Sequence, residues 1–371
     1  MAQVTAAPLR IAMIGTPYYE IPPTGYGGIE LICADLVDAL VARGHRVTLF
    51  GAGPRSRTRA AFVSTRPALQ YQRLGEAMPE LLHAARVTRL LRDAGDSFDI
   101  VHDHSAAGPL MACARSAPTV VTVHGSATGE LGDLYAELGR SVGLVAISAA
   151  QRRHRPELNW VATVHNAVDP ARFRAEHRPD GPVLWLARFS PDKGPDLAIE
   201  ACRRAGVPLV LAGKCSEPDE RCYLEEVIRP MIGGDVELLL DAERATTREL
   251  LTRARCLIMP IRWHEPFGMV MVEAMASGTP VVALRRGSVP EVVRHGVTGW
   301  ICEDPDDLPT LLRRSTELDP AACVAHVRER FSAGVMAQRY ETVYRQVIAR
   351  SRHRAKAGRR VLAHRDVNQL V

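Results

Sequence analysis

Short apolar runs and amphipathic stretches alternate along this chain in two successive series. In the first series, an apolar run at 10–15 is followed by a turn-rich loop, an amphipathic stretch at 29–44 and a second apolar run at 47–53. This order predicts a strand, a loop, a helix and a strand, which together form one βαβ unit of a parallel sheet. Three further strand-like runs extend the series, at 99–104, 119–125 and 143–148.

A second series of the same kind follows a polar segment at 174–182 that is rich in proline and glycine. It begins with the apolar run 182–189 and continues through four further strand-like runs, interleaved with helical patterns, as far as 284. Two consecutive doubly wound halves predict an α/β protein with two Rossmann-like domains facing a central cleft. Ligands of such sheets bind beyond the carboxyl ends of the strands.

These patterns give the expected domain organisation. We expect a first domain over 1–175, a second domain over 176–334, a last helix over 335–350 and a basic, flexible tail over 351–371. The stretch 345–371 holds eight Lys and Arg against one acid, whereas the whole chain carries a net charge of only +5. The positive charge therefore belongs to the end of the chain, and the folded body is close to neutral.

The amino-acid composition indicates the class of protein and its cellular compartment. With 46% hydrophobic and 24% charged residues in 371 positions, the sequence is typical of a globular protein and excludes a disordered or fibrous one. The eight cysteines form no C-x-x-C motif, and no run of about 18 apolar residues occurs. We therefore expect a cytoplasmic protein, which could still touch the inner face of a membrane.

The loop after the first predicted strand is rich in glycine. Gly27 and Gly28 precede the first helix, where glycines allow close approach of a ligand and free amides suit a phosphate. A role in the turn alone explains them equally well. The loop lacks the G-x-G-x-x-G fingerprint, and no acidic residue ends the second strand. A dinucleotide-dependent dehydrogenase is therefore disfavoured.

Two cations follow the first strand of the second series. Arg188 and Lys193 lie between that strand and the next helix, at the predicted mouth of the sheet. A guanidinium and an ammonium at such a place can neutralise a diphosphate without a metal. A solvated charged turn is the plainer reading.

The segment 264–274, HEPFGMVMVEA, joins a strand to a helix. The first amides of that helix, near Phe267, Gly268, Met269 and Val270, would be free to bind a phosphate or a sugar hydroxyl. A carboxylate in the apolar run MVMVEAMA, Glu273, is costly to bury unless it accepts strong hydrogen bonds, for example from a ribose diol. The alternative is a surface glutamate on the polar side of the helix.

Histidines end two of the predicted strands of the first domain. His124 follows one strand, and His102 and His104 end another. A single histidine of this kind is more often a structural hydrogen-bond donor, but three of them share one edge of the sheet. Because His102 and His104 are expected on opposite faces of their strand, we expect no metal site.

These residues carry a resemblance to a known family. The motifs ARFSPDKG at 187–194, HEPFGMVMVEAMASGTPVVA at 264–283 and GSVPEVVRHGVTGW at 287–300 resemble those of the retaining nucleotide-sugar glycosyltransferases of family 4, which have the GT-B fold. The opening loop PPTGYGGIE and His124 are similar to the first domain of the same family. The similarity runs from about residue 10 to about residue 348.

The resemblance implies roles for these residues. The second domain would hold a nucleoside diphosphate sugar and the first an acceptor, with the last helix crossing back to the first domain. Arg188 and Lys193 would bind the diphosphate, and Glu273 would hold the ribose. The sugar hydroxyls would meet Glu265, together with the amides of the segment from Phe267 to Val270. The remaining implied contacts are His124 with the sugar, and Gly27 and Gly28 with the phosphates.

The implied reaction is transfer of a hexosyl group from a UDP- or GDP-sugar to a hydroxyl acceptor with retention of configuration. The departing diphosphate would take the acceptor proton, and neither a cofactor nor a metal is expected. The acceptor could be a glycan, a lipid-linked group or a small molecule. Two alternatives remain, a sugar-nucleotide epimerase of the same fold and a non-catalytic nucleotide-sugar-binding module. A glycogen-type phosphorylase is disfavoured because nothing resembles a pyridoxal phosphate lysine site.

The tail 351–371 departs from the shared pattern. The simpler interpretation is a tail that is exposed to solvent. The more specific interpretation is that the tail contacts the surface of an anionic membrane. We expect no nucleic-acid partner.

Overall fold

The computed structural model describes residues 7–25, 27–176 and 178–368, with side chains described as far as Arg354. The described chain forms two compact units. The first unit comprises residues up to Ala146, the stretch Arg155–Val164 and the chain from Met336 onward. The second comprises Ile147–His154 and His165–Val335.

The first unit contains a parallel sheet of seven strands in the order β3-β2-β1-β4-β5-β6-β7. The order reverses between β1 and β4, which is the topological switch point of a doubly wound sheet. Its strands are β1 (Arg10–Ile14), β2 (Arg46–Ala52), β3 (Ala61–Arg66), β4 (Ile100–Asp103), β5 (Thr119–Val123), β6 (Val142–Ala146) and β7 (Trp160–Thr163). The sequence patterns predicted five of these strands and missed β3 and β7.

Helices cover this sheet and connect its strands. The helical segments of the first unit are α1 (Gly28–Ala42), η1 (Tyr71–Arg73), α2 (Ala77–Asp93), η2 (Gly108–Ala114), α3 (Gly129–Leu138), η3 (Gly139–Ser141) and most of α13 (Ala333–Asn368). Strands β4, β5 and β6 are buried along their whole length, as expected for a parallel sheet with both faces covered.

The second unit contains a parallel sheet of six strands in the order β10-β9-β8-β11-β12-β13. Its order reverses between β8 and β11, so this sheet is also doubly wound. The strands are β8 (Val183–Leu186), β9 (Leu209–Gly213), β10 (Val236–Leu240), β11 (Cys256–Met259), β12 (Val281–Leu284) and β13 (Gly299–Cys302). Only β13 was missed in the sequence.

The helical segments of the second unit lie before, between and after its strands. They are α4 (Ala149–Arg153), η4 (Pro170–Arg172), η5 (Pro191–Lys193), α5 (Pro195–Ala205), α6 (Pro218–Tyr223), the π-helical turn η6 (Leu224–Ile228), α7 (Arg229–Met231), α8 (Arg244–Arg253), α9 (Met269–Ala276), α10 (Val289–Val292), η7 (Pro305–Asp307), α11 (Leu308–Arg314), η8 (Ser315–Glu317) and α12 (Pro320–Arg330). The predicted α/β class with two Rossmann-like sheets is confirmed.

The units divide at other points than the expected boundary near 175. The segment Ile147–His154 lies in the second unit because the Glu291 carboxylate accepts hydrogen bonds from the amides of Ala149 and Ala150, at 2.7 and 2.6 Å. His165 is held there by the same carboxylate, 3.2 Å from its Nε2. The polar segment 174–182, which we expected to be the linker, therefore follows a division already made at Val164.

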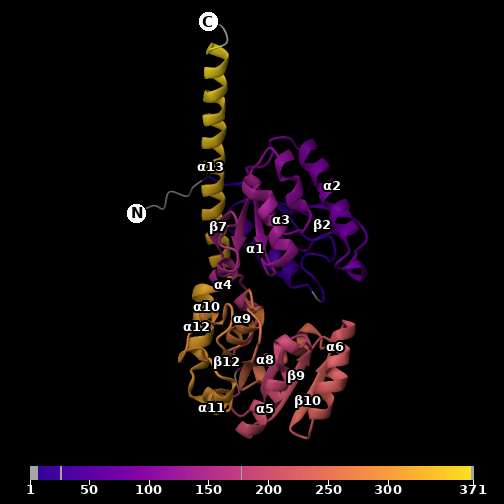
Figure 1. The fold of residues 1–371 in the computed structure, drawn as a ribbon, viewed down its shortest axis with the longest axis vertical. Helices are drawn as coiled ribbons and strands as arrows, with labels where there is room; N and C mark the ends of the chain where they lie inside the picture. Colours follow the sequence, from indigo (N-terminus) through magenta and orange to yellow (C-terminus); the bar gives the residue numbers. More distant parts are fainter. Residues whose placement is uncertain (1–6, 26, 177, 369–371) are drawn as a thin grey trace. The chain divides into compact units, whose positions relative to one another are not determined.

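Helix α13 fastens the end of the chain to the first unit, where it lies close to α1 and β7 (Figure 1). Glu341 accepts a hydrogen bond from Arg43, at the end of α1, at 2.7 Å. The Tyr344 side chain is fully buried. The helix continues to Asn368, whereas we expected it to end near 350 and a tail to follow. The added stretch contains no proline and many Ala, Arg and Lys, which favour a helix.

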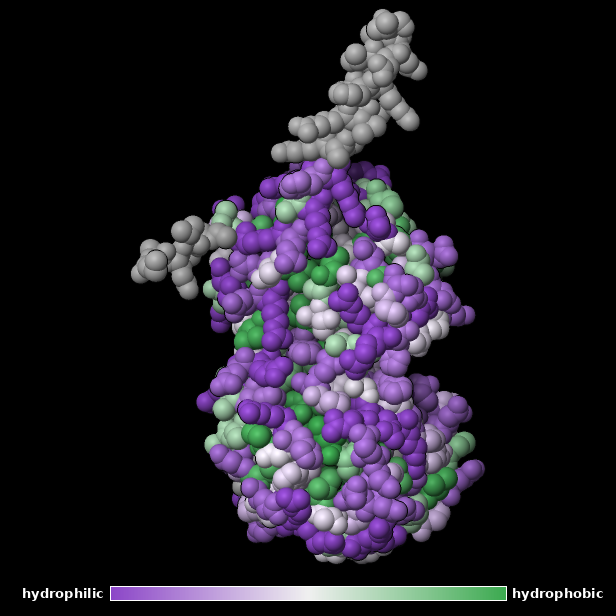
Figure 2. Space-filling view, turned by 60° about the vertical axis from the view of Figure 1, so that its left-hand side comes forward, coloured by the Kyte–Doolittle hydropathy of each residue, from purple (hydrophilic) through white to green (hydrophobic). Residues whose placement is uncertain are grey.

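The surface is that of a globular protein. Hydrophilic residues predominate on the face shown in Figure 2, with apolar residues in separate patches among them. In the part of the chain that the structure describes, every helix is too short or too polar to cross a membrane. The eight cysteines all lie within that part, and each is a free thiol.

Candidate active site

The loop after β8 is held in place by the strand before it and by a neighbouring loop. The Trp185 indole donates a hydrogen bond to the Lys193 carbonyl at 3.1 Å. Gly194 follows in the left-handed conformation, with φ +66°, and a Cβ at this position would lie 2.3 Å from the Pro260 carbonyl oxygen. Only glycine fits so close an approach. The position of Lys193 is therefore determined by the backbone on both sides of it.

The structure brings two of the predicted site residues into direct contact. Lys193 Nζ lies 2.7 Å from Glu265 Oε2, and the two side chains are 13% and 15% exposed. The Trp263 indole donates to the same carboxylate oxygen at 3.1 Å, and Lys193 Nζ lies 4.2 Å from the centre of the Trp263 ring. A cation, a carboxylate and an aromatic ring thus form one cluster at the carboxyl ends of β8 and β11.

The backbone around Glu265 is fixed by the loop that follows β12. The Ser288 amide donates to the Glu265 carbonyl at 2.9 Å, and the Ser288 hydroxyl donates to the Phe267 carbonyl at 2.8 Å. Gly287 has φ +53°, and a Cβ there would come within 2.3 Å of the Glu265 carbonyl oxygen. The contact between the two loops therefore requires a glycine at 287.

Helix α9 begins directly after this segment. Gly268 is its N-cap, with φ +74°, and the amides of Met269 and Val270 belong to the first turn, which the helix itself leaves unbonded. The Phe267 side chain is 2% exposed and packs in the core, so only its backbone can contribute to a site. The predicted helix N-terminus is therefore present next to Glu265.

Glu273 lies one turn further along α9 and is half-buried. Burial raises the pKa of its carboxyl, and the positive charges of Arg244 and Arg248 oppose this shift. No hydrogen bond to the carboxylate is recorded from the described residues. The interpretation as a solvated surface glutamate does not fit this burial, and the carboxylate is free to accept hydrogen bonds from a ligand.

Arg188 is paired with a residue that the sequence analysis did not single out. Its guanidinium Nη1 donates to Glu220 Oε1 at 2.8 Å, and the Arg188 side chain is 54% exposed. Glu220 is buried and also accepts from the Ser216 and Glu217 amides, which completes a capping box at the start of α6. A ligand that binds Arg188 must therefore compete with a well-held carboxylate.

The glycine loop of the first unit lies at the start of α1. Gly27 has φ +139° and is the N-cap, and Gly28 is the first residue of the helix. A Cβ at Gly27 would lie 2.9 Å from Glu30 Oε2, whereas one at Gly28 would meet nothing within 4 Å. Glu30 is buried and accepts a hydrogen bond from the Thr16 hydroxyl. Tyr26, in the same loop, lies outside the described residues.

The three histidines form one cluster within the first unit, joined by a hydrogen bond and a contact between rings. His124 Nε2 lies 2.8 Å from His104 Nδ1, and the ring centres of His102 and His104 are 4.1 Å apart. Our expectation that His102 and His104 lie on opposite faces was wrong. Residues two positions apart in an extended chain lie on the same face, so the period of the strand already places these two rings together.

The cluster extends to α13. His102 Nδ1 lies 2.7 Å from the Tyr344 hydroxyl, and His102 Nε2 lies 2.7 Å from the hydroxyl of Thr122, which in turn contacts the Tyr340 hydroxyl at 2.6 Å. Burial lowers the pKa of His102 to about 3 and that of His124 to about 4. Both rings are therefore neutral at pH 7.

One atom of this cluster has no partner. His124 Nδ1 is buried and makes no hydrogen bond with the described residues. A buried, unpaired ring nitrogen is costly, and a ligand hydroxyl would satisfy it. Within the described residues, no group of three or more His, Cys, Asp and Glu is arranged to hold a metal ion.

Several residues of the second-unit site were missed in the sequence. Trp263 and Glu220 contact predicted residues directly, and Gly287 fixes the backbone of Glu265. Gly287 and Glu291 belong to the motif at 287–300. The motif therefore singled out this segment, but it did not predict which residues Gly287 and Glu291 contact. Nothing in the pattern around Glu220 pointed to Arg188.

Comparison with known proteins defines the class. A model of the glycosyl transferases group 1 matches residues 171–318, and a model of glycosyltransferase family 4 matches residues 26–172. The chain is therefore a glycosyltransferase enzyme and not the non-catalytic binding module considered above. With two doubly wound sheets and both domain models in order, it belongs to the GT-B glycosyltransferases of the family 4 type.

Similar proteins agree with this class. The glycogen synthase of Mycobacterium tuberculosis is 27% identical over 86% of this chain and 89% of its own length. The phosphatidyl-myo-inositol mannosyltransferase of the same organism is 27% identical over 81% of this chain and 84% of its own. The crystal structure of AviGT4, a glycosyltransferase involved in avilamycin A biosynthesis, aligns with a TM-score of 0.71 at 27% identity and covers 92% of this chain and 98% of that one.

Proposed function

We propose that this glycosyltransferase moves a hexosyl group from a UDP- or GDP-sugar to a hydroxyl acceptor, with retention of the anomeric configuration. The observation that carries the proposal is the cluster of Lys193, Glu265 and Trp263 beside the first turn of α9. It offers a cation, a hydrogen-bond acceptor and free amides at the carboxyl ends of a doubly wound sheet, where ligands of such sheets bind.

Each residue of the second unit has a chemical part in this proposal. The Lys193 ammonium and the Arg188 guanidinium would neutralise the diphosphate, and for this they would exchange the carboxylates of Glu265 and Glu220 for phosphate oxygens. Glu265, once released, would accept hydrogen bonds from the sugar hydroxyls. Glu273, which makes no recorded hydrogen bond, would accept from the ribose diol.

The first unit supplies the remaining proposed contacts. His124 is neutral at pH 7, and its unpaired Nδ1 suits a hydrogen bond to a sugar hydroxyl. Gly27 and Gly28 at the start of α1 would line the phosphate side, because a backbone without side chains allows close approach.

The proposed reaction takes place on one face of the sugar. The bond between the anomeric carbon and the diphosphate oxygen breaks, and the acceptor oxygen bonds to the same carbon from the same side. The acceptor proton passes to the departing diphosphate, which serves as the base. Lys193 and Arg188 stabilise the negative charge that develops on this leaving group. No metal takes part in the proposed steps.

The first experiment identifies the donor. A thermal-shift panel of UDP, GDP, ADP and their sugar conjugates is measured on the full chain, because a ligand that binds only the folded state raises the melting temperature. We expect a UDP or GDP compound to give the largest rise. A response to ADP compounds alone would contradict the proposed donor class.

The second experiment tests the assignment of Glu265. We expect Glu265→Ala to lower the turnover of the identified donor by at least about a hundredfold, since it removes contacts to the reacting sugar. Glu303→Ala is the matched control, because Glu303 also forms an ion pair in the second unit, with Arg285, but is 68% exposed. Equal turnover of the two variants would refute the assignment.

The products separate transfer from epimerisation. NMR of the reaction mixture is expected to show a new glycoside with the anomeric configuration of the donor, formed only when an acceptor is present. An inverted glycoside would contradict retention, and an epimerised sugar formed without acceptor would indicate the epimerase.

A further inference from the structure

A cavity of about 230 Å³ lies in the first unit, at the end of the sheet opposite to the histidine cluster. Its walls include the residues that open β5 and β6, Thr119 and Val142, whereas His124 follows the carboxyl end of β5. Because the strands are parallel, their amino ends share one edge of the sheet and their carboxyl ends the other. The cavity is therefore separate from the candidate active site.

Three arginines from two separate segments line this cavity. Arg140 comes from η3, before β6, and Arg350 and Arg354 come from α13. None of the three forms an ion pair with another described residue. Arg350 and Arg354 are four positions apart, which places two like charges on one helix face at a small cost in stability. An anion between them and Arg140 would remove this repulsion.

Three other polar groups of the wall are used within the protein. The buried guanidinium of Arg115 is paired with Asp103 at 2.8 Å, so its charge is already neutralised. The Ser141 hydroxyl donates to the Leu138 carbonyl at 2.6 Å, and the Asn159 amide donates to the Val142 carbonyl at 2.5 Å. No acidic residue lines the cavity. The net charge of the lining is therefore that of Arg140, Arg350 and Arg354.

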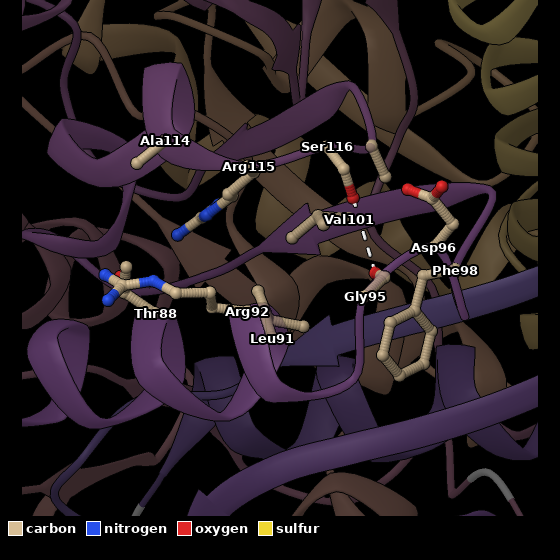
Figure 3. Close-up of a pocket in the computed structure, with 11 residues that line it drawn as sticks. Thr88, Leu91, Arg92, Gly95, Asp96, Phe98, Val101, Ala114, Arg115 and Ser116 are labelled. Atoms are coloured by element: carbon tan, nitrogen blue, oxygen red, sulfur yellow. Dashed lines mark hydrogen bonds between the residues drawn. The ribbon is translucent and has the colours of Figure 1, made fainter.

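A neighbouring cavity of about 150 Å³ has the opposite character. It shares the segment 115–117 with the first cavity, and Ser116 donates there to the Gly95 carbonyl at 3.4 Å (Figure 3). Two cations, Arg92 and Arg115, and one acid, Asp96, line it together with apolar side chains such as Phe98 (Figure 3), and the charge of Arg115 is already neutralised by Asp103. This second cavity offers no excess of positive charge for an anion. The two cavities adjoin each other and differ in the charge of their linings.

We propose that the cavity between η3, β6 and α13 binds a phosphate-bearing anion. A guanidinium binds two phosphate oxygens with parallel hydrogen bonds, and three unpaired guanidiniums suit a dianion better than a carboxylate. The volume is below the range of about 300–1,000 Å³ that is usual for drug-sized ligands, so the ligand is a small phosphorylated group. A free phosphate compound and the headgroup of an anionic lipid both present this chemistry.

The first test uses inorganic phosphate as the probe. Melting temperature is followed against phosphate concentration at constant ionic strength, with Lys193→Ala in every protein so that the candidate donor site is weakened and contributes equally in all of them. We expect Arg140→Ala and Arg350→Ala each to need about tenfold more phosphate for the same rise in melting temperature. The use of both variants distinguishes a site built by two segments from a general effect of the charge on α13.

The matched control is Arg352→Ala. Arg352 lies on α13 between Arg350 and Arg354 and carries the same charge, but it does not line the cavity. Its positive charge instead helps to lower the pKa of the Asp99 carboxyl. We expect this variant to respond to phosphate as the Lys193→Ala parent does. An equal weakening in all three arginine variants, or none in any of them, would contradict a defined phosphate site.

The second test separates the two sources of phosphate. The full chain is sedimented with vesicles of phosphatidylcholine alone and with vesicles that also contain phosphatidylglycerol. If the ligand is a lipid headgroup, the chain sediments with the anionic vesicles only, and Arg140→Ala reduces this binding more than Arg352→Ala does. A phosphate response without vesicle binding assigns the site to a free phosphate compound. Failure of both tests overturns the proposal and leaves the proposed transferase function untouched.

Discussion

Lys193 Nζ and Glu265 Oε2 lie 2.7 Å apart, although 72 positions separate the two residues in the chain. Each of them follows a different strand of the second sheet, β8 or β11, and these strands are neighbours in the sheet. The doubly wound order therefore brings the two charges together. Because both side chains are largely buried, the pair is shielded from water and its energy exceeds that of a surface ion pair.

A double-mutant cycle tests the strength of this pair. We expect Lys193→Ala and Glu265→Ala each to lower the free energy of unfolding by about 1–3 kcal/mol, since each leaves the partner charge poorly solvated. The double variant should lose less than the sum of the two, with a coupling of about 1–2 kcal/mol. Chemical denaturation at pH 7 measures all four proteins. Additive effects would show that the two charges do not interact in solution.

Gly287 provides a test of how the Glu265 loop is positioned. Gly287→Ala would place a methyl group 2.3 Å from the Glu265 carbonyl oxygen, on a residue with φ +53°. We expect it to destabilise the fold by more than about 2 kcal/mol and to reduce turnover, because the loop must move. Thermal unfolding and the transfer assay measure the two effects.

Gly296 offers the matched control for this substitution. It also has a positive φ, of +74°, but a Cβ there would meet only Trp300, at 3.7 Å. Gly296→Ala should therefore cost about 1 kcal/mol for the backbone conformation alone and leave turnover unchanged. If both glycine variants lost the same stability and activity, close approach to Glu265 would not be the reason.

The sequence predicted most of the fold because buried parallel strands are continuous apolar runs. Strands β4, β5 and β6 are of this kind and were found. The missed strands β3 and β7 lie at the two edges of their sheet, where burial is partial and the apolar pattern is weaker. Strand β13, also at an edge, is short and begins with a glycine.

The site was predictable to the extent that its residues follow strands. Lys193, Glu265 and His124 each follow the carboxyl end of a strand, so their place at the sheet edge could be inferred. The hydrogen-bond partners of the site residues could not be inferred. A contact such as that between Arg188 and Glu220 joins a loop to the start of a helix 32 positions further along the chain, and it depends on the course of both. The contact between His102 and His104 was missed for another reason, because residues two positions apart in a strand lie on the same face and not on opposite ones.

The ionised carboxylate of Glu273 is expected to lower the free energy of unfolding. Its pKa is raised by burial, so the folded state binds a proton more readily than the unfolded state does, and ionisation at neutral pH opposes folding. We expect Glu273→Gln to raise the free energy of unfolding at pH 7 by up to about 1 kcal/mol and to weaken donor binding. The gain should shrink as the pH falls, because the wild-type carboxyl then becomes neutral. Melting temperatures at pH 7 and pH 5 measure the effect, and a less stable variant at pH 7 would contradict it.

The buried histidines make stability depend on pH in the opposite direction. Burial lowers the pKa of His124 to about 4 and that of His102 to about 3, whereas an unfolded histidine titrates near 6.5. Below pH 6.5 the unfolded state therefore binds more protons than the folded state. The stability is complete above pH 6.5 and decreases as the pH falls toward 4, by about 1.4 kcal/mol per pH unit for each such ring.

Substitution of one ring isolates this effect from that of the carboxylates. His124→Asn removes one titrating group and retains an amide that can hydrogen bond to His104. We expect the free energy of unfolding of this variant to decrease less steeply between pH 6.5 and 4.5 than that of the wild type, by about 1.4 kcal/mol per unit. Replacement of His353, which is exposed on α13, by Asn is the control and should leave the slope unchanged. Parallel curves for the wild type and His124→Asn would show that the folded chain protonates His124 as readily as the unfolded chain does, and burial would then not lower the pKa of this ring.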